Sequence, residues 1–149
     1  MALPEMYTKS VSAANKVKRR DLQELAVIRL KDAQVLIENR RFDAAYYLAG
    51  YAVECALKAC VAKKTERYEF PDKELALQVY IHDLTRLLKP AGLAQIWQEE
   101  LEADLALGRM WGVVKEWSEQ SRYRTYSRKD SVDMVKGAQG VFECIKKFW

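Results

Sequence analysis

Apolar residues recur every three or four positions through most of the chain, and this spacing predicts α-helices. The first such stripe predicts a helix over residues 21–39, and a second helix follows from about Phe42 to Lys64. The first stripe consists of Leu22, Leu25, Ala26, Ala33, Leu36 and Ile37.

The second predicted helix is unusually apolar, because Glu54 and Lys58 are the only charged residues between Ala44 and Ala62. A membrane span would place both charges near the bilayer centre, at about 2.5 kcal/mol or more each. We therefore predict the central core helix of a water-soluble bundle, packed on two sides and solvated on one. We expect the Glu54–Lys58 pair on the solvated side, where such a pair contributes about 0.2–0.5 kcal/mol. The expected solvated arc holds Asp43, Tyr47, Gly50, Tyr51, Glu54 and Lys58.

Another side of this helix carries small residues, which let a second helix approach closely. That second helix would come from the same subunit or from another copy of the chain. The small-residue side consists mainly of Ala44, Ala45, Ala52, Ala56, Ala59 and Ala62.

The second half of the chain predicts further helices. The segment HDLTRLLKPAGL predicts a short helix that begins near His82 or Asp83. Residues 93–117 keep helical spacing with a soft point near Gly108, and a last helix begins near Ser127. Asp130, three residues after Ser127, suggests a variant of the capping box. The segment LALQVYI fits either a strand or a helix.

These elements predict an all-α fold, an up-and-down antiparallel four-helix bundle with an additional short helix. Six glycines and three prolines are few for an all-β fold, which needs many tight turns. We expect residues 1–20 to form a loose N-terminal arm and residues 21–149 to form the bundle domain.

Composition narrows the function classes only a little. The net charge of +4 permits contact with nucleic acid without arguing for it. Three cysteines without a CxxC pair indicate a reducing compartment, and we expect a cytoplasmic protein. The first twenty residues lack the apolar core of a signal peptide, and no segment resembles a membrane span.

Metal and cofactor chemistry find little support in the sequence. His82 is the only histidine, glycine-rich phosphate loops are absent, and the cysteines lie in apolar surroundings where thiols are usually inert. We therefore predict no metal site and no cofactor.

The segment SRYRTYSRK is the most distinctive chemical feature, because basic residues alternate with Tyr123 and Tyr126. Arginine forks fit phosphate oxygens, and tyrosine rings stack on bases. The plainer interpretation is a charged loop whose arginines pair with acidic neighbours or cap the preceding helix. Both interpretations remain open on the residues alone. The basic residues are Arg122, Arg124, Arg128 and Lys129.

Three segments in order, RRFDAAYYLAGYAVECALKACVAK, HDLTRLL and WSEQSRYRTYS, resemble the HEPN domain (higher eukaryotes and prokaryotes nucleotide-binding). The similarity extends from about Asp21 to Trp149. It implies a bundle of four main helices plus a short one, usually dimeric. Many family members are encoded beside a minimal nucleotidyltransferase and act with it as a toxin–antitoxin pair.

The resemblance also implies an activity, since many members are metal-independent endoribonucleases with an R-x(4–6)-H motif. In that motif the arginine stabilises the charge on phosphorus while the histidine moves protons. No histidine follows Arg122 or Arg124 at this spacing. Only Arg122 has a counterpart in the motif, so we expect no ribonuclease activity of the usual type.

Three hypotheses follow. The first is a HEPN-like homodimer that binds a nucleotide or RNA phosphate and has a minimal nucleotidyltransferase as the partner that the resemblance implies. The second is a divergent ribonuclease in which His82 approaches Arg122 in space. The third is a helical interaction module without a ligand. The candidate binding residues are Arg122, Tyr123, Arg124, Tyr126 and His82.

Overall fold

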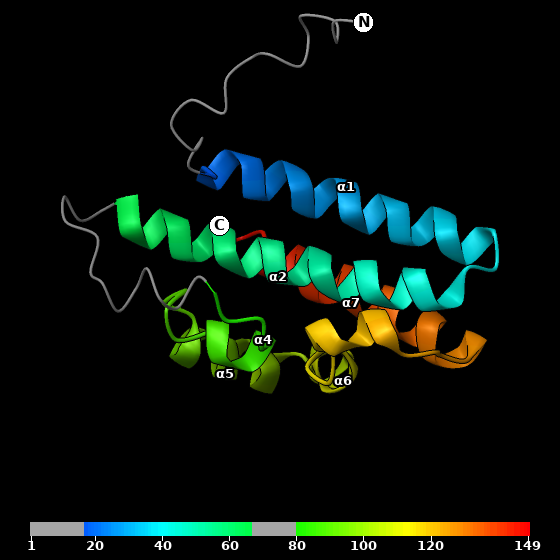
Figure 1. Cartoon of the computed structure of the whole chain (residues 1–149). Helices are drawn as coiled ribbons and strands as arrows, with labels where there is room; N and C mark the ends of the chain where they lie inside the picture. The colour runs from blue at the N-terminus through cyan, green and yellow to red at the C-terminus, as the bar shows by residue number, and fades with distance from the viewer. Residues whose placement is uncertain (1–16, 67–79) are drawn as a thin grey trace, which may run out of the picture.

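The computed structural model describes residues 17–66 and 80–149, and these residues form helices joined by short connections without a strand (Figure 1). The all-α prediction is therefore confirmed. The elements are α1 (Arg19–Glu38), α2 (Phe42–Glu66), α4 (Leu84–Leu87), α5 (Ala94–Ala103), α6 (Leu105–Val114), the 3₁₀ helix η2 (Glu119–Tyr123) and α7 (Arg128–Ile145).

Helix α2 is the central element, with α1 on one side and α7 and the shorter helices on the others (Figure 1). A tight turn at residues 39–41 makes α1 and α2 antiparallel, and Arg40 adopts a left-handed backbone there, with φ 57°. Helices α2 and α7 start side by side, because the Ser131 hydroxyl donates to the Phe42 carbonyl at 2.9 Å. The order of directions is that of an up-and-down bundle.

The small-residue side of α2 is packed inside the chain. Ala45, Ala52, Ala56 and Ala59 are completely buried. Trp97, Trp111 and Trp117 are buried too, and the rings of Trp97 and Trp111 meet edge to face at 5.2 Å between centroids. These buried alanines and tryptophans therefore pack within the chain.

The predicted helix over residues 93–117 is broken earlier than expected. The break lies at Asp104, whose side chain accepts hydrogen bonds from the backbone N–H groups of Ala106 and Leu107. This N-cap starts α6 in a new direction, whereas Gly108 lies inside α6. The fourth long helix of the predicted bundle is consequently two shorter helices.

The other helix boundaries follow the predicted signals closely. Asp83 caps α4, and Ser127 caps α7 by accepting from the Asp130 N–H at 3.1 Å. The expected second half of the box, from Asp130 back to Ser127, is not among the contacts of the described residues. Helix α1 begins at Arg19, and most of the expected N-terminal arm and of LALQVYI lies outside the described residues.

None of the described helices combines the length and the hydropathy that crossing a membrane requires.

Candidate functional site

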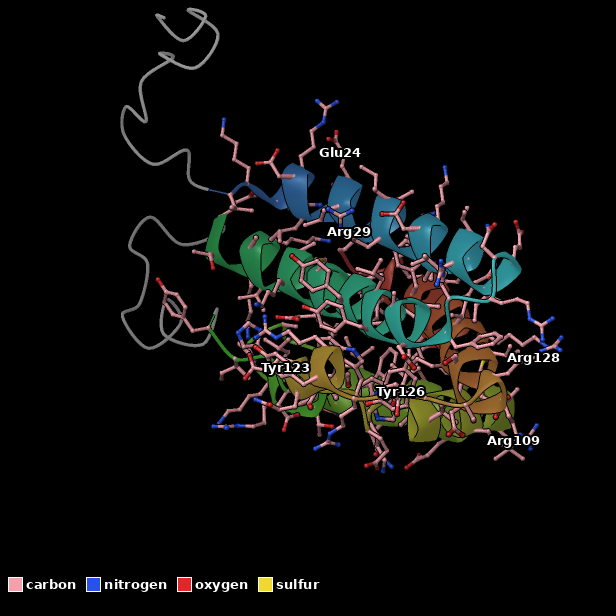
Figure 2. All side chains as sticks on the ribbon, turned by 45° about the vertical axis from the view of Figure 1, so that its right-hand side comes forward. Glu24, Arg29, Arg109, Tyr123, Tyr126 and Arg128 are labelled. Carbon is pink, nitrogen blue, oxygen red and sulfur yellow. The ribbon has the colours of Figure 1, made fainter. Side chains whose placement is uncertain are left out.

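The segment between α6 and α7, residues 115–127, forms a connector that runs beside α2 (Figure 2). Trp117 fixes its beginning, because its indole N–H donates to the Tyr47 carbonyl at 3.1 Å. A Cβ atom at Gly50 would overlap the Trp117 ring, so only glycine permits this approach. The connector is therefore held directly against the α2 backbone.

Tyr126 fixes the end of the connector. Its ring stacks on the Tyr46 ring with centroids 3.6 Å apart, and its backbone N–H donates to the Asp43 carboxylate at 2.6 Å. Burial, together with the neighbouring Tyr126 phenol, raises the pKa of Tyr46 to about 12. Tyr126 is thus a structural anchor that is half-buried against α2, and its ring is already stacked within the chain.

Arg122 and Tyr123 lie between these anchors and face solvent. The Tyr123 side chain is 75% exposed, and the Arg122 guanidinium lies 5.2 Å from the centroid of the Tyr123 ring. Arg124 is exposed as well. The ion pairs found among residues 17–66 and 80–149 include none with Arg122 or Arg124. The plainer interpretation, arginines paired with acidic neighbours, therefore finds no support at these two positions.

A buried carboxylate lies beneath the connector. Glu54 is only 1% exposed, and its Oε1 atom accepts from Lys58 Nζ and contacts His82 Nδ1, both at 2.6 Å. A buried charge needs such partners, because transfer from water without them is very unfavourable. Lys58 and His82 supply them from α2 and from the turn before α4.

The expectation of a solvated Glu54–Lys58 pair was therefore wrong. The helical wheel placed both residues correctly on one face of α2. That face is covered by the His82 turn and by the connector, which helical periodicity alone does not reveal. Tyr47, Tyr51 and Lys58 on the same face are half-buried.

His82 links α2 to the connector. Its Nε2 atom lies 3.3 Å from the Glu119 carboxylate, so both ring nitrogens face carboxylates. Glu119 begins the 3₁₀ helix that contains Arg122, and residues three apart in a 3₁₀ helix lie on the same face. The structure thus brings His82 to the helical turn beside Arg122, although about forty residues separate them in sequence.

A cleft of about 490 Å³ opens beside this contact. It lies between the His82 turn with α4 and the first half of the connector. Its walls include Tyr80, His82, Arg86, Lys115 and Glu119. Its walls combine cationic, anionic and aromatic side chains, whereas Arg122 and Tyr123 lie outside it and are exposed.

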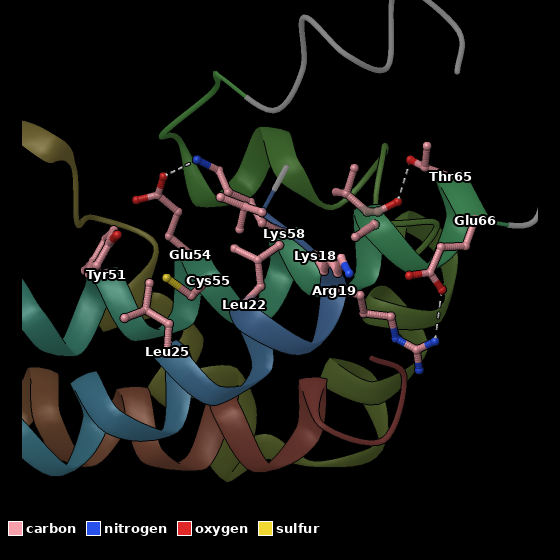
Figure 3. A pocket seen from close by; sticks show the side chains of 13 residues that line it. Lys18, Arg19, Leu22, Leu25, Tyr51, Glu54, Cys55, Lys58, Thr65 and Glu66 are labelled. Atoms are coloured by element: carbon pink, nitrogen blue, oxygen red, sulfur yellow. Dashed lines mark hydrogen bonds and ion pairs between the residues drawn. The ribbon is translucent and has the colours of Figure 1, made fainter. Parts of the chain in front are cut away.

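A second hollow lies on the opposite side of Glu54, between α1 and α2 (Figure 3). It measures about 620 Å³ and has mostly apolar walls, with Glu54 and Lys58 joined by an ion pair at one end. At the other end Arg19 reaches Glu66 at 3.5 Å. Burial raises the pKa of Tyr51, which also lines this groove, to about 12.

Cysteine and metal chemistry remain without support. The three thiols are buried, and burial raises their pKa values to about 11 for Cys55 and Cys144 and about 12 for Cys60. Thiols with such pKa values are poor nucleophiles. No group of three or more potential metal ligands occurs in the part of the chain that the structure describes.

Sequence reasoning missed two residues of this region, Glu54 as a buried partner of His82 and Glu119 as its second partner. A signal for Glu54 existed, because an isolated acid in an apolar helix requires a compensating cation or proton donor. Glu119 carried no such signal, since acidic residues are common in polar connectors.

Comparison with models of known protein families gives a match over nearly the whole chain. The model of the HEPN domain matches residues 20–148. No curated protein and no solved structure matches the chain significantly.

Proposed function

The chain belongs to the HEPN domain family, and from this premise we propose that its connector binds the phosphates of a nucleotide or RNA. The observation that carries the proposal is the exposed pair of Arg122 and Tyr123 on a connector held at both ends. An arginine fork binds phosphate oxygens, and an exposed ring offers a face on which a base stacks. Because the backbone is fixed, little conformational entropy is lost on binding.

His82 takes a positioning role in this proposal rather than the phosphate contact expected from sequence. Its two ring nitrogens contact Glu54 and Glu119, so it ties the 3₁₀ helix to the buried carboxylate of α2. Tyr126 likewise acts as an anchor through Tyr46 and Asp43. Arg122, Tyr123 and Arg124 remain as the residues that contact the ligand.

Titration of single-stranded RNA and of ATP at low salt tests the proposal, since phosphate contacts are strongest there. We expect Arg122→Ala and Tyr123→Ala each to weaken binding about tenfold. Arg20→Ala removes an exposed arginine from α1 and serves as the control. Absence of binding to the wild-type protein would favour a ligand-free interaction module instead.

A divergent ribonuclease is the second candidate, and the contact between His82 and Glu119 favours it. Glu54 holds the imidazole at Nδ1, and Nε2 lies against Glu119, which is three residues before Arg122 in the same 3₁₀ helix. A histidine that moves protons and an arginine that stabilises the charge on phosphorus can together cleave a phosphodiester when both reach the same phosphate. The usual R-x(4–6)-H spacing is absent, so the first proposal expects binding without cleavage.

Incubation of RNA with the protein in the presence of a chelator separates the two candidates. Cleavage that disappears in both Arg122→Ala and His82→Ala would replace the first proposal with the second. Circular dichroism of His82→Ala is needed as a folding check, because the substitution leaves Lys58 as the only side chain that contacts the Glu54 carboxylate among the described residues.

Two partner expectations accompany family membership, a homodimer and a minimal nucleotidyltransferase in a toxin–antitoxin pair. Both stay proposals. Light scattering of the purified chain tests the first. Co-purification with a nucleotidyltransferase encoded beside this chain tests the second.

A further inference from the structure

A second group of arginines lies beyond the connector, at the end of the bundle where α2 and α7 begin. Arg40 and Arg41 occupy the turn that leads into α2, and Arg128 is the first residue of α7. Contacts between Ser131 and Phe42, and between Tyr126 and Asp43, bring these two starts together. Figure 2 shows Arg128 at the same end of the molecule as the turn between α1 and α2.

The contacts of the described residues give these three arginines no structural role. Arg40, Arg41 and Arg128 are exposed, and none forms an ion pair within the described ranges 17–66 and 80–149. Arg40 also has φ 57°, a backbone region that glycine or asparagine occupies more easily. The backbone therefore offers no reason for an arginine at this position.

Two carboxylates of the same region, Asp43 and Asp133, are engaged with the protein. Asp43 accepts the Tyr126 N–H, and Asp130 lies in the first turn of α7, where the helix dipole attracts an acidic group. Asp133 pairs with Lys129 at 2.9 Å. The longer arginine side chains reach further from the backbone than these aspartates, so a polyanion meets the guanidinium groups first.

The arginine group continues the connector. Tyr123, Tyr126 and Arg128 follow one another toward this end of the bundle in Figure 2. The connector runs beside α2 from the level of Glu54, through the His82–Glu119 contact, to the level of Asp43. Asp43 and Glu54 are eleven residues apart in α2, which corresponds to about 16 Å along the helix axis. A stacked single strand advances about 3.4 Å per nucleotide, so this length matches roughly five nucleotides.

We infer that Arg40, Arg41 and Arg128 extend the connector site into a track for a single-stranded polynucleotide. This inference rests on the proposed function and makes its ligand a chain of several nucleotides rather than a mononucleotide. Arg122 and Tyr123 hold one part of the strand, and the arginines of the turn and of α7 hold the phosphates that follow.

The test compares a labelled single-stranded RNA several times longer than the track with a dinucleotide. Arg40→Ala/Arg41→Ala is the test variant. Lys63→Ala/Lys64→Ala, at the opposite end of the same helix, removes the same charge and is the control. We expect the test variant to bind the long RNA about tenfold more weakly. The slope of the logarithm of its binding constant against the logarithm of the salt concentration should become shallower by about 1.4, at about 0.7 per lost phosphate contact. Dinucleotide binding and the control variant should be unchanged.

The other outcomes of this test would overturn the track or assign it a different ligand. Equal weakening by both double variants would show a response to net charge alone and overturn the track. A normal test variant beside a defective Arg122→Ala would also overturn it, while leaving the proposed function intact. No binding of either probe to the wild-type protein would overturn both. Competition by poly-glutamate as strong as by RNA would assign the arginines to acidic protein chains instead. A matching DNA strand tells whether the ribose hydroxyl contributes, and binding of either strand supports the track.

Discussion

Glu54 shows how one residue joins three elements of this protein. Its carboxylate is buried in α2, and it contacts Lys58 one turn later and His82 before α4. His82 extends the contact to Glu119 at the start of the 3₁₀ helix. The buried Glu54 carboxylate depends on its contacts with Lys58 and His82, and the same contacts fix the positions of those two side chains.

Replacing Glu54 with glutamine removes the charge while keeping the shape of the side chain. We expect a loss of about 1–2 kcal/mol in the free energy of unfolding, because Lys58 and His82 are left half-buried without their anion. Urea denaturation measures this change. Glu24→Gln, which removes an exposed partner of Arg20, should cost less than about 0.5 kcal/mol. Equal effects of the two substitutions would contradict the structural role of Glu54.

Tyr46 gives a second prediction at the residue scale. Its pKa rises to about 12 from the ordinary value of 10.0, mainly because of burial. Above pH 10 the unfolded chain releases this proton while the folded chain keeps it, so folding stability falls as the pH rises from about 10 to about 12. Below pH 10 the contribution is fully present. Phenolate absorbance during an alkaline titration, with Tyr46→Phe as the comparison, measures the late-ionising group. Complete ionisation near pH 10 in the folded protein would contradict the assignment.

At the scale of elements, apolar periodicity and capping residues were enough to predict most helices. Asp83 and Ser127 mark the starts of α4 and α7 in the structure as they do in the sequence. The break at Asp104 was missed because Gly108 is the more conspicuous helix breaker, whereas an aspartate becomes a cap only in the right geometry. The sequence did not predict that the His82 turn and the connector cover the Glu54 face of α2, because both segments are distant from Glu54 in sequence.

Substitutions at two glycines compare the effect of packing against a neighbouring segment with the effect of helix propensity. Gly50→Ala should destabilise the protein by about 1–3 kcal/mol, because the new methyl group overlaps Trp117 and displaces the connector. Gly112→Ala in α6 meets no atom within 4 Å and should stabilise the protein by about 0.5–1 kcal/mol through helix propensity. Thermal unfolding monitored by circular dichroism measures both. Stabilisation by Gly50→Ala would mean that Trp117 does not pack on α2 as described.

At the scale of the whole molecule, the sequence predicted the fold class and located the connector, but it did not predict which side chains of the connector the fold leaves exposed. Residue types alone made Arg122 and Tyr123 candidates. They did not separate these two residues from Tyr126 and His82, which the structure engages with Tyr46, Asp43, Glu54 and Glu119. That division depends on which side chains burial leaves available, and burial follows from tertiary packing.

The three cysteines allow a test of whether the bundle unfolds as one unit. Cys55 and Cys60 lie in α2 and Cys144 lies near the end of α7, and burial raises the pKa of each to about 11 or 12. Because α2 packs against both α1 and α7, exposing any of these thiols requires disrupting the shared core. We expect all three to resist alkylation at mildly alkaline pH and to become reactive together across one denaturant transition. Mass spectrometry of alkylated peptides follows each thiol separately. Labelling of Cys144 well before Cys55 and Cys60 would show that the end of α7 opens independently of the central helix.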